Sequence, residues 1–232
     1  MNKKISNRLS KSKIKSFKQC PRQLYLTQTY PEEIVKGEAL IRGTELHDIL
    51  DKLYSYNIDF KDKEQVYKTL LNLDTQNKYT PQLNLFVDWL ELLEFPVPEN
   101  TEEKIYDKQD DIVIMYDRID YDGEKRVLWD YKTGKKKNVN EFKFELMMYA
   151  YYFMKQKRKQ VHYVGIYFID YGTFDMLPVT KKDLQEVVAD IHNEQANIRE
   201  AERNNVFPAK LQFFCKWCPV NHICEKYQKY GR

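Results

Sequence analysis

Three side chains within residues 112–134 could act together on a phosphate ester. Asp117 closes one predicted strand, and Asp130 and Lys132 lie at the end of the next strand of a predicted hairpin. Because side chains alternate between the two faces of a strand, Asp130 and Lys132 point the same way and Tyr131 points into the opposite packing layer. Pairing within the hairpin can bring Asp117 beside them.

This set of side chains suits phosphodiester hydrolysis. Two carboxylates can bind a hard divalent cation such as Mg²⁺ or Mn²⁺. The cation would polarise the phosphate and lower the pKa of a bound water, and a neighbouring lysine would offset the developing negative charge. An Asp-x-Lys sequence is very common, however, and taken alone it is better explained by turn and strand-end aspartates with a surface lysine.

The elements that must position these side chains form an alternating pattern. Apolar spacing predicts helices first and short Ile-, Val- and Tyr-rich strands after residue 100, with a turn at 120–124. The predicted helices cover residues 10–29, 38–56, 63–73, 82–93, 141–157 and 181–204, and the predicted strands cover 103–108, 111–116, 126–131, 161–171 and 173–178. The sequence therefore predicts one α/β domain over 1–232, with helices covering a mixed central sheet.

Four cysteines form a second candidate site. Cys215, Cys218 and Cys224 lie close together near one end of the sequence, and Cys20 lies near the other. Four thiolates suit either a tetrahedral zinc or an iron–sulfur cluster, and the spacing does not choose between them. The plainer alternative is a set of buried thiols without a metal.

Composition and charge bear on the expected partners and location of the protein. The net charge is only +3, so binding of nucleic acid would depend on local basic groups such as the run from Lys132 to Lys137. The basic first residues lack the apolar core of a signal peptide, and no segment is long and apolar enough to span a membrane. We expect a cytoplasmic protein without a membrane partner, whose thiols stay reduced.

Four short segments, in order, resemble the motifs of the RecB-type nucleases within the PD-(D/E)xK superfamily. RGTELHDIL resembles the helical G-x-x-x-H motif, matched by Gly43 and His47. YDRID and WDYKTGK resemble the first aspartate motif and the D-x-K motif, and FELMMYAYY resembles the Q-L-x-x-Y-A helix. The resemblance covers about residues 11–227 and implies a restriction-endonuclease-like core.

The resemblance implies a role for each matched residue. His47, Asp117, Asp130 and the backbone carbonyl of Tyr131 would bind Mg²⁺ or Mn²⁺. Lys132 would be the catalytic lysine. The remaining two residues of the implied catalytic set are Glu145 and Tyr149. This chain departs from the family pattern at Ile114, where the family has Gly, and at Glu145, where it has Gln.

The cysteine spacing resembles that of a subset of the family that includes the bacterial AddB subunit and the small CRISPR-associated nucleases. In that subset one cysteine precedes the nuclease core and three follow it. The resemblance implies that Cys20, Cys215, Cys218 and Cys224 hold a [4Fe-4S] cluster. A tail over 205–232 would then be joined to Cys20, and residues 55–100 would form a helical insertion.

The leading hypothesis is a metal-dependent DNA exonuclease. It would act on single-stranded or end-accessible DNA in recombination, repair, phage replication or CRISPR adaptation. A separate helicase, recombination or CRISPR-adaptation protein is a candidate partner, since the sequence contains no phosphate-binding G-x-x-x-x-G-K-[ST] loop. The alternatives are a non-catalytic nucleic-acid-binding module with a structural metal clip and, with less support, an electron-transfer protein.

Overall fold

The computed structural model describes residues 5–94 and 96–230, which form two compact units built from separate stretches of the chain. We call them the sheet unit and the cysteine unit. The sheet unit consists of Glu38–Ile105 and Met115–Leu184, and the cysteine unit consists of Met1–Gly37, Tyr106–Ile114 and Gln185–Arg232. The expectation of a single domain over 1–232 stays a prediction.

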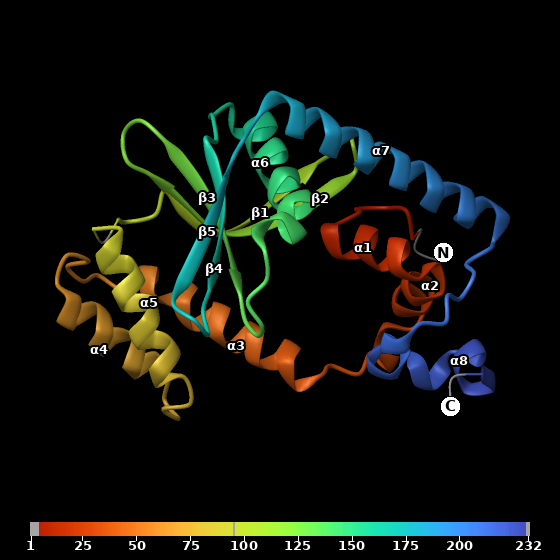
Figure 1. The fold of residues 1–232 in the computed structure, drawn as a ribbon, viewed down its shortest axis with the longest axis horizontal. Helices are drawn as coiled ribbons and strands as arrows, with labels where there is room; N and C mark the ends of the chain where they lie inside the picture. The colour runs from red at the N-terminus through yellow and green to blue at the C-terminus, as the bar shows by residue number, and fades with distance from the viewer. Residues whose placement is uncertain (1–4, 95, 231–232) are drawn as a thin grey trace. The chain divides into compact units, whose positions relative to one another are not determined.

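A five-stranded mixed sheet organises the described part of the chain (Figure 1). Its order is β1 (Asn100–Asp107), β2 (Ile112–Tyr121), β3 (Arg126–Lys132), β4 (Tyr163–Phe168) and β5 (Thr173–Pro178). The pairs β2–β3 and β4–β5 are antiparallel, and β3–β4 is parallel. A parallel pair needs a crossover connection, and the helix α6 (Lys143–Lys157) supplies it. The predicted α/β class with a mixed central sheet is confirmed.

Helices cover both faces of the sheet. On one face α3 (Glu38–Lys52), α4 (Lys63–Leu73) and α5 (Thr80–Leu92) pack against Trp129, Tyr131 and Tyr167 in one hydrophobic core. Tyr131 therefore points into the packing layer that alternation predicts. Helix α6 packs against β3 and β4. The helices α4 and α5 occupy the predicted insertion, and they cover the sheet face opposite to Asp130 and Lys132.

The turn predicted at 120–124 begins later than expected. Strand β2 continues through Asp120 to Tyr121, so Asp117 lies inside the strand and does not close it. The reason is that Arg118 and Asp120 are both buried and form an ion pair, with Asp120 also accepting a hydrogen bond from Trp129 Nε1. A paired charge satisfies the hydrogen-bonding needs that would otherwise expel Asp120 to a loop.

In the cysteine unit, the predicted helix over 10–29 is two helices, α1 (Lys11–Gln19) and α2 (Pro21–Thr29). The prediction of one helix is wrong because Pro21 disfavours helical geometry at the residue before it. Cys20 accordingly takes an extended conformation, with φ −158° and ψ 105°. The break leaves Cys20 between two helices.

The other described elements are one long helix and several short ones. Helix α7 (Lys181–Asn204) and strand β5 have the predicted bounds. The short ones are η1 (Pro31–Glu33), η2 (Leu53–Ser55), η3 (Val139–Phe142), η4 (Phe213–Trp217), η5 (Asn221–Ile223) and α8 (Glu225–Tyr230). No helix among the described residues has the length and apolar character needed to cross a membrane.

Candidate metal and catalytic site

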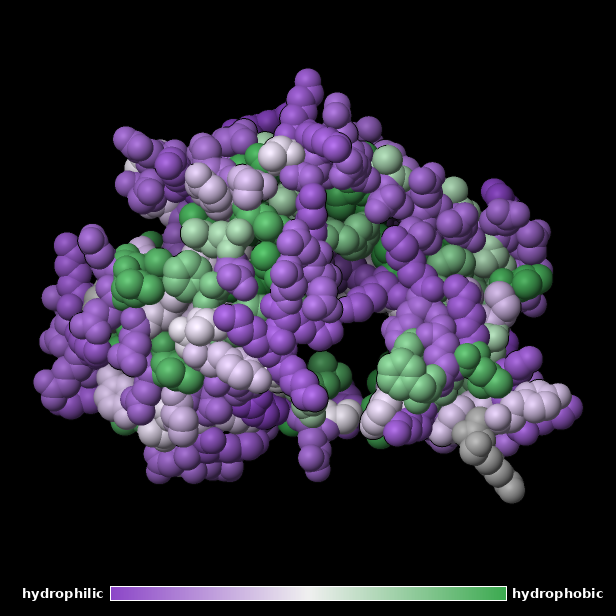
Figure 2. Space-filling model, viewed as in Figure 1, coloured by the Kyte–Doolittle hydropathy of each residue, from purple (hydrophilic) through white to green (hydrophobic). Residues whose placement is uncertain are grey.

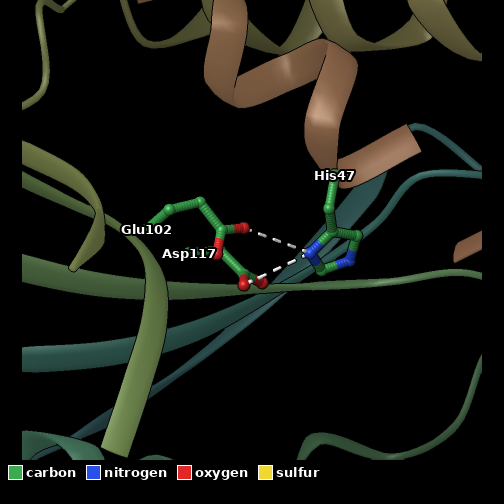
Figure 3. A group of neighbouring side chains, drawn as sticks. All are labelled: His47, Glu102 and Asp117. Carbon is green, nitrogen blue, oxygen red and sulfur yellow. Dashed lines mark ion pairs between the residues drawn. The ribbon is translucent and has the colours of Figure 1, made fainter. Parts of the chain in front are cut away.

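Three potential metal ligands meet in the sheet unit (Figure 3). His47 comes from α3, Glu102 from β1 and Asp117 from β2, and one ligand atom from each lies within 4.8 Å of the other two. The imidazole faces both carboxylates, with His47 Nδ1 3.3 Å from Asp117 Oδ1 and 3.6 Å from Glu102 Oε1. Elements far apart in the sequence thus contribute to one small group.

The spacing of these atoms fits a six-coordinate divalent cation. With ligand distances of about 2.1 Å, neighbouring ligands of an octahedron lie about 3.0 Å apart and opposite ligands about 4.2 Å apart. The distances of 3.3 and 3.6 Å from His47 Nδ1 exceed the spacing of neighbouring ligands by only about 0.3 and 0.6 Å, so small side-chain shifts bring these donors onto one cation. One imidazole and two carboxylates are also suitable donors for a transition ion such as Mn²⁺. The residues present therefore fit a bound divalent metal.

The local charges are balanced by a proton in the absence of a cation. Burial lowers the pKa of His47, but the nearby Asp117, Glu102 and Asp130 carboxylates outweigh burial and raise it to about 10. Burial raises the pKa of Glu102, and the Asp117 charge raises it further. The His47 imidazole is therefore protonated at neutral pH, and metal binding through its ring nitrogen must release that proton.

A second group of predicted residues lies around Lys132. Its ammonium forms ion pairs with Asp130 and with Glu145, the latter at 2.9 Å. Both carboxylates are buried, whereas Lys132 is only partly buried. Burial raises the pKa of Tyr149, and the Asp130 and Glu145 charges raise it further, so its phenol stays protonated and able to donate. The structure thus brings Asp130, Lys132, Glu145 and Tyr149 together.

Strand pairing connects the two groups. The β2–β3 register pairs Arg118 with Trp129, and one step further along the same register sets Asp117 opposite Asp130. The Asp117 carboxylate also accepts a hydrogen bond from the Tyr131 amide. Asp130 is close enough to raise the pKa of His47. The Tyr131 carbonyl as a metal ligand stays a prediction.

A glycine sets the close approach of α3 to the end of β3. A Cβ atom on Gly43 would lie 3.3 Å from Thr133 Oγ1, which is a tight contact. Thr133 directly follows Lys132, and His47 lies about one helical turn beyond Gly43 on α3. A glycine at position 43 therefore lets the helix that carries His47 approach the strand that carries Asp130 and Lys132.

A polar clamp holds the loop after Lys132. Asp170 accepts two hydrogen bonds from the Arg42 guanidinium, one of them 2.9 Å long, and a 2.6 Å hydrogen bond from the Gly134 amide. Gln82 donates to the same carboxylate. Gly134 has φ +87°, a conformation that glycine adopts without strain. The clamp ties α3, α5 and the turn after β4 to the residues that follow the D-x-K motif.

The four cysteines meet in the cysteine unit. Cys20, Cys215, Cys218 and Cys224 line one cavity, and none forms a disulfide. Burial raises the pKa of Cys218, and the other three cysteines raise it further. Backbone amides point at the sulfurs, with Lys210 N 3.4 Å from Cys20 Sγ and Gln212 N 3.3 Å from Cys215 Sγ. The set therefore offers four thiols in one cavity, two of which accept backbone amide hydrogen bonds.

His222 lies in the loop between Cys218 and Cys224, but its side chain points to another partner. Its Nε2 lies 3.0 Å from Glu33 Oε2. This contact gives the His222 imidazole a partner outside the group of four cysteines.

Comparisons with known proteins show the family of the chain and its fold. Residues 8–225 match the PD-(D/E)XK nuclease superfamily, and the chain belongs to it. A solved structure from Eubacterium rectale, described as a “Putative exonuclease”, has the same fold, with 12% identity, a TM-score of 0.59, and coverage of 91% of this chain and 88% of that one. A second structure, SSO0001, has 15% identity and a TM-score of 0.44, with coverage of 95% and 86%. No curated protein matches the chain.

Sequence reasoning missed three residues around the site. Glu102 belongs to no motif, and its adjacent Glu103 offers the same side chain, so the sequence gives no sign of which one faces His47. Arg42 and Asp170 are 128 positions apart and meet only because α3 lies against the sheet. The one available signal was the position of Arg42 beside Gly43 of the helical motif.

Proposed function

We propose that this protein is a metal-dependent DNA nuclease whose active site is formed by His47, Glu102, Asp117, Asp130 and Lys132. The observation that carries the proposal is the meeting of a three-residue cation site with the Asp130–Lys132 pair on neighbouring strands. Membership of the nuclease superfamily supports phosphodiester hydrolysis as the reaction of this proposed site.

Each side chain has a task in this proposal. A divalent cation held by His47, Glu102 and Asp117, with Asp130 and the Tyr131 carbonyl nearby, would polarise the phosphate and lower the pKa of a bound water. Lys132, which pairs with Asp130, supplies a positive charge for the scissile phosphate. Tyr149 and Glu145 orient Lys132 from α6. Because one donor is an imidazole, Mn²⁺ should bind more tightly than Mg²⁺.

We further propose that the nuclease is an exonuclease acting on single strands or accessible ends in the cytoplasm. It would serve one of the pathways that expose such ends: recombination, repair, phage replication or CRISPR adaptation. A separate motor or adaptation protein would then supply the strand. We also propose that the chain forms a single domain with a helical insertion at 55–100.

The cysteine site would hold a [4Fe-4S] cluster. In tetrahedral zinc with Zn–S distances of about 2.3 Å, the sulfurs lie about 3.8 Å apart. Among the described residues, no three of the cysteines have all their sulfurs within 4.8 Å of one another, so the sulfurs lie farther apart than tetrahedral zinc holds them. A four-iron cluster spreads its ligands because each thiolate binds a different iron. The cluster would join the 205–232 tail to Cys20.

The test is cleavage of labelled DNA by full-length protein with Mn²⁺, Mg²⁺ or EDTA. Linear and circular single strands, and duplexes with free or blocked ends, separate exonuclease from endonuclease action. Asp130→Ala and Lys132→Ala should each abolish cleavage, whereas Asp88→Ala, at an exposed surface ion pair, should not. Cleavage by Asp130→Ala at the parent rate would refute the assigned site.

A second candidate is a non-catalytic module that binds nucleic acid. The observation that favours it is that Lys132 forms ion pairs with two buried carboxylates, an arrangement that can also serve structure alone. Binding of DNA with no cleavage under any metal condition would support this candidate over the nuclease.

A further inference from the structure

The tail of the cysteine unit carries an exposed group of aromatic and basic side chains. Phe213, Trp217 and Tyr230 are 81%, 66% and 57% exposed, which is unusual for rings of this size. Lysines lie over two of these rings. We call Phe213, Lys216, Trp217, Lys226, Lys229 and Tyr230 together the tail aromatic surface. In Figure 2, pale and green side chains interrupt the purple surface in the region that carries η4 and α8.

The rings and cations are arranged in contact with one another. Phe213 and Trp217 meet nearly edge to face, with centroids 6.4 Å apart and planes at 86°. Lys216 Nζ lies 4.0 Å from the centroid of Trp217. Lys226 and Lys229 place their ammonium groups 5.3 and 5.1 Å from the centroid of Tyr230. Positive charge therefore lies directly beside flat apolar faces.

The cysteines explain why these rings face outward. Cys215 and Cys218 line the cavity that also contains Cys20 and Cys224, and Trp217 lies between them in the sequence. Turning the two cysteines inward leaves Trp217 on the outside of the short helix η4. A separate hollow of about 380 Å³ adjoins it, lined in part by Phe213, Tyr227 and Tyr230. Its size is that of a pocket for a small planar group.

We propose that the tail aromatic surface binds single-stranded nucleic acid, with bases stacked on Trp217, Phe213 and Tyr230 and with the lysines at the phosphates. The positive charge of this surface favours nucleic acid as the bound molecule. Residues 205–230 contain four lysines (Lys210, Lys216, Lys226 and Lys229) and one acidic residue (Glu225), which gives 4 − 1 = +3 for this short stretch and equals the net charge of the whole chain. Aromatic platforms interleaved with cations are the usual means of holding unpaired strands without reading their sequence. The cores of protein interfaces, in contrast, are depleted of lysine.

Unpaired bases are required because a duplex keeps its base faces stacked inside the helix. A single strand can turn successive bases onto Trp217 and Phe213, and every base offers a flat face. The inference rests on the proposed function only in taking the bound strand to be the substrate. Binding itself needs neither the divalent cation nor the carboxylates of the sheet unit.

Tryptophan fluorescence gives a direct readout. The chain has three tryptophans, and Trp89 and Trp129 are each only 2% exposed. Stacking of a base on Trp217 should therefore quench the exposed fraction of the emission. Titration of full-length protein with an oligothymidine should quench this emission, and Trp217→Phe should bind the same strand without that quenching. A parent protein that binds the strand with no change in emission would overturn the proposal.

Affinity is then measured by fluorescence anisotropy with a labelled single strand, in the Asp130→Ala background and without divalent cations. Trp217→Ala and Phe213→Ala should each weaken binding by roughly 5- to 100-fold, the effect of losing one stacked base. Lys216→Ala should lower the slope of log affinity against log salt by about 0.7. Tyr56→Ala and Lys68→Ala serve as matched controls, since both side chains are exposed in the sheet unit. Both controls should bind as the parent does.

Three results separate the possible outcomes. If Trp217→Ala and Phe213→Ala bind as the parent does while the parent cleaves DNA, this surface is wrong and the nuclease proposal stands. If binding is lost in these variants but the parent never cleaves DNA, the surface stands and the nuclease proposal fails. Loss of self-association in Trp217→Ala by sedimentation, with strand binding unchanged, would assign the surface to contacts between copies and overturn the proposal. Unchanged circular dichroism and metal content guard against misfolding, and Trp217→Phe and Lys216→Ala keep the test valid if the alanine variants fail to fold.

Discussion

Replacing Glu102 with glutamine should weaken Mn²⁺ binding while leaving the metal-free protein as stable as before. Glutamine keeps the size of the side chain but removes the charge beside His47 Nδ1. Burial already raises the pKa of Glu102, so the folded protein loses little when the charge disappears. His47 and Asp117 remain as donors. Changes in the surroundings of a metal ligand cost 10- to 100-fold in affinity, and loss of a charged ligand should cost at least as much, about 1.4–2.7 kcal/mol or more.

Isothermal titration calorimetry with MnCl₂ at pH 7 measures the affinity directly, and thermal unfolding with and without Mn²⁺ gives an independent value through linkage. The matched control is Glu103→Gln, because the neighbouring side chain accepts a hydrogen bond from Tyr116 and pairs with Lys157 instead. Glu103→Gln should lower stability without changing the Kd for Mn²⁺. Equal Mn²⁺ affinity in Glu102→Gln and the parent would falsify the assignment of Glu102 as a ligand.

Three further predictions concern the helix α6, the cysteines and the clamp. Glu145→Gln should leave DNA cleavage measurable, since an amide can still contact Lys132, and Glu145→Ala should lower the rate further; a fully active alanine variant would place Glu145 outside the site. Protein purified without oxygen should be brown with about four irons per chain, and Cys20→Ala should lower both iron content and thermal stability as much as Cys218→Ala; a colourless protein with one zinc would contradict the cluster. Asp170→Asn should destabilise by about 2 kcal/mol through the weakened bond to Arg42. The Arg42 hydrogen bond lowers the pKa of Asp170 below 3.8. The stability that the ionised Asp170 contributes is therefore present above pH 3.8 and is lost as the pH falls through the lower folded-state pKa. In urea titrations from pH 7 to pH 2, the free energy of unfolding of Asp170→Asn should consequently fall less steeply with acid than that of the parent.

Local patterns predicted most of the elements in this fold. The helix over 63–73 and the strand over 173–178 have the expected bounds, because apolar spacing and flanking polar residues mark both ends. The errors came from long-range pairing and from proline. Asp120 looks like a turn residue until its buried partner Arg118 and Trp129 are known. The helix break at Cys20 was readable from Pro21, but the apolar stripe on both sides of it favoured one helix.

The candidate site was predictable where motifs carry it and not elsewhere. His47, Asp130 and Lys132 lie in recognisable segments, and alternation along β3 gives the shared face of Asp130 and Lys132. Glu102 is different, because the direction in which its side chain points depends on how the edge strand β1 pairs with β2. Its backbone is left-handed, with φ +45°, which interrupts the regular alternation that a sequence pattern assumes. Such local deviations are what the residue order alone does not reveal.

The division of the chain into units has a consequence for the order of synthesis. All the residues of the sheet unit precede residue 185, whereas the cysteine unit needs both 1–37 and 185–232. On the ribosome the sheet unit can therefore fold before Cys215, Cys218 and Cys224, the partners of Cys20, have been synthesised. Until those residues emerge, helices α1 and α2 lack part of their packing partners. Chaperones that recognise exposed apolar segments would have their longest opportunity at the beginning of this chain.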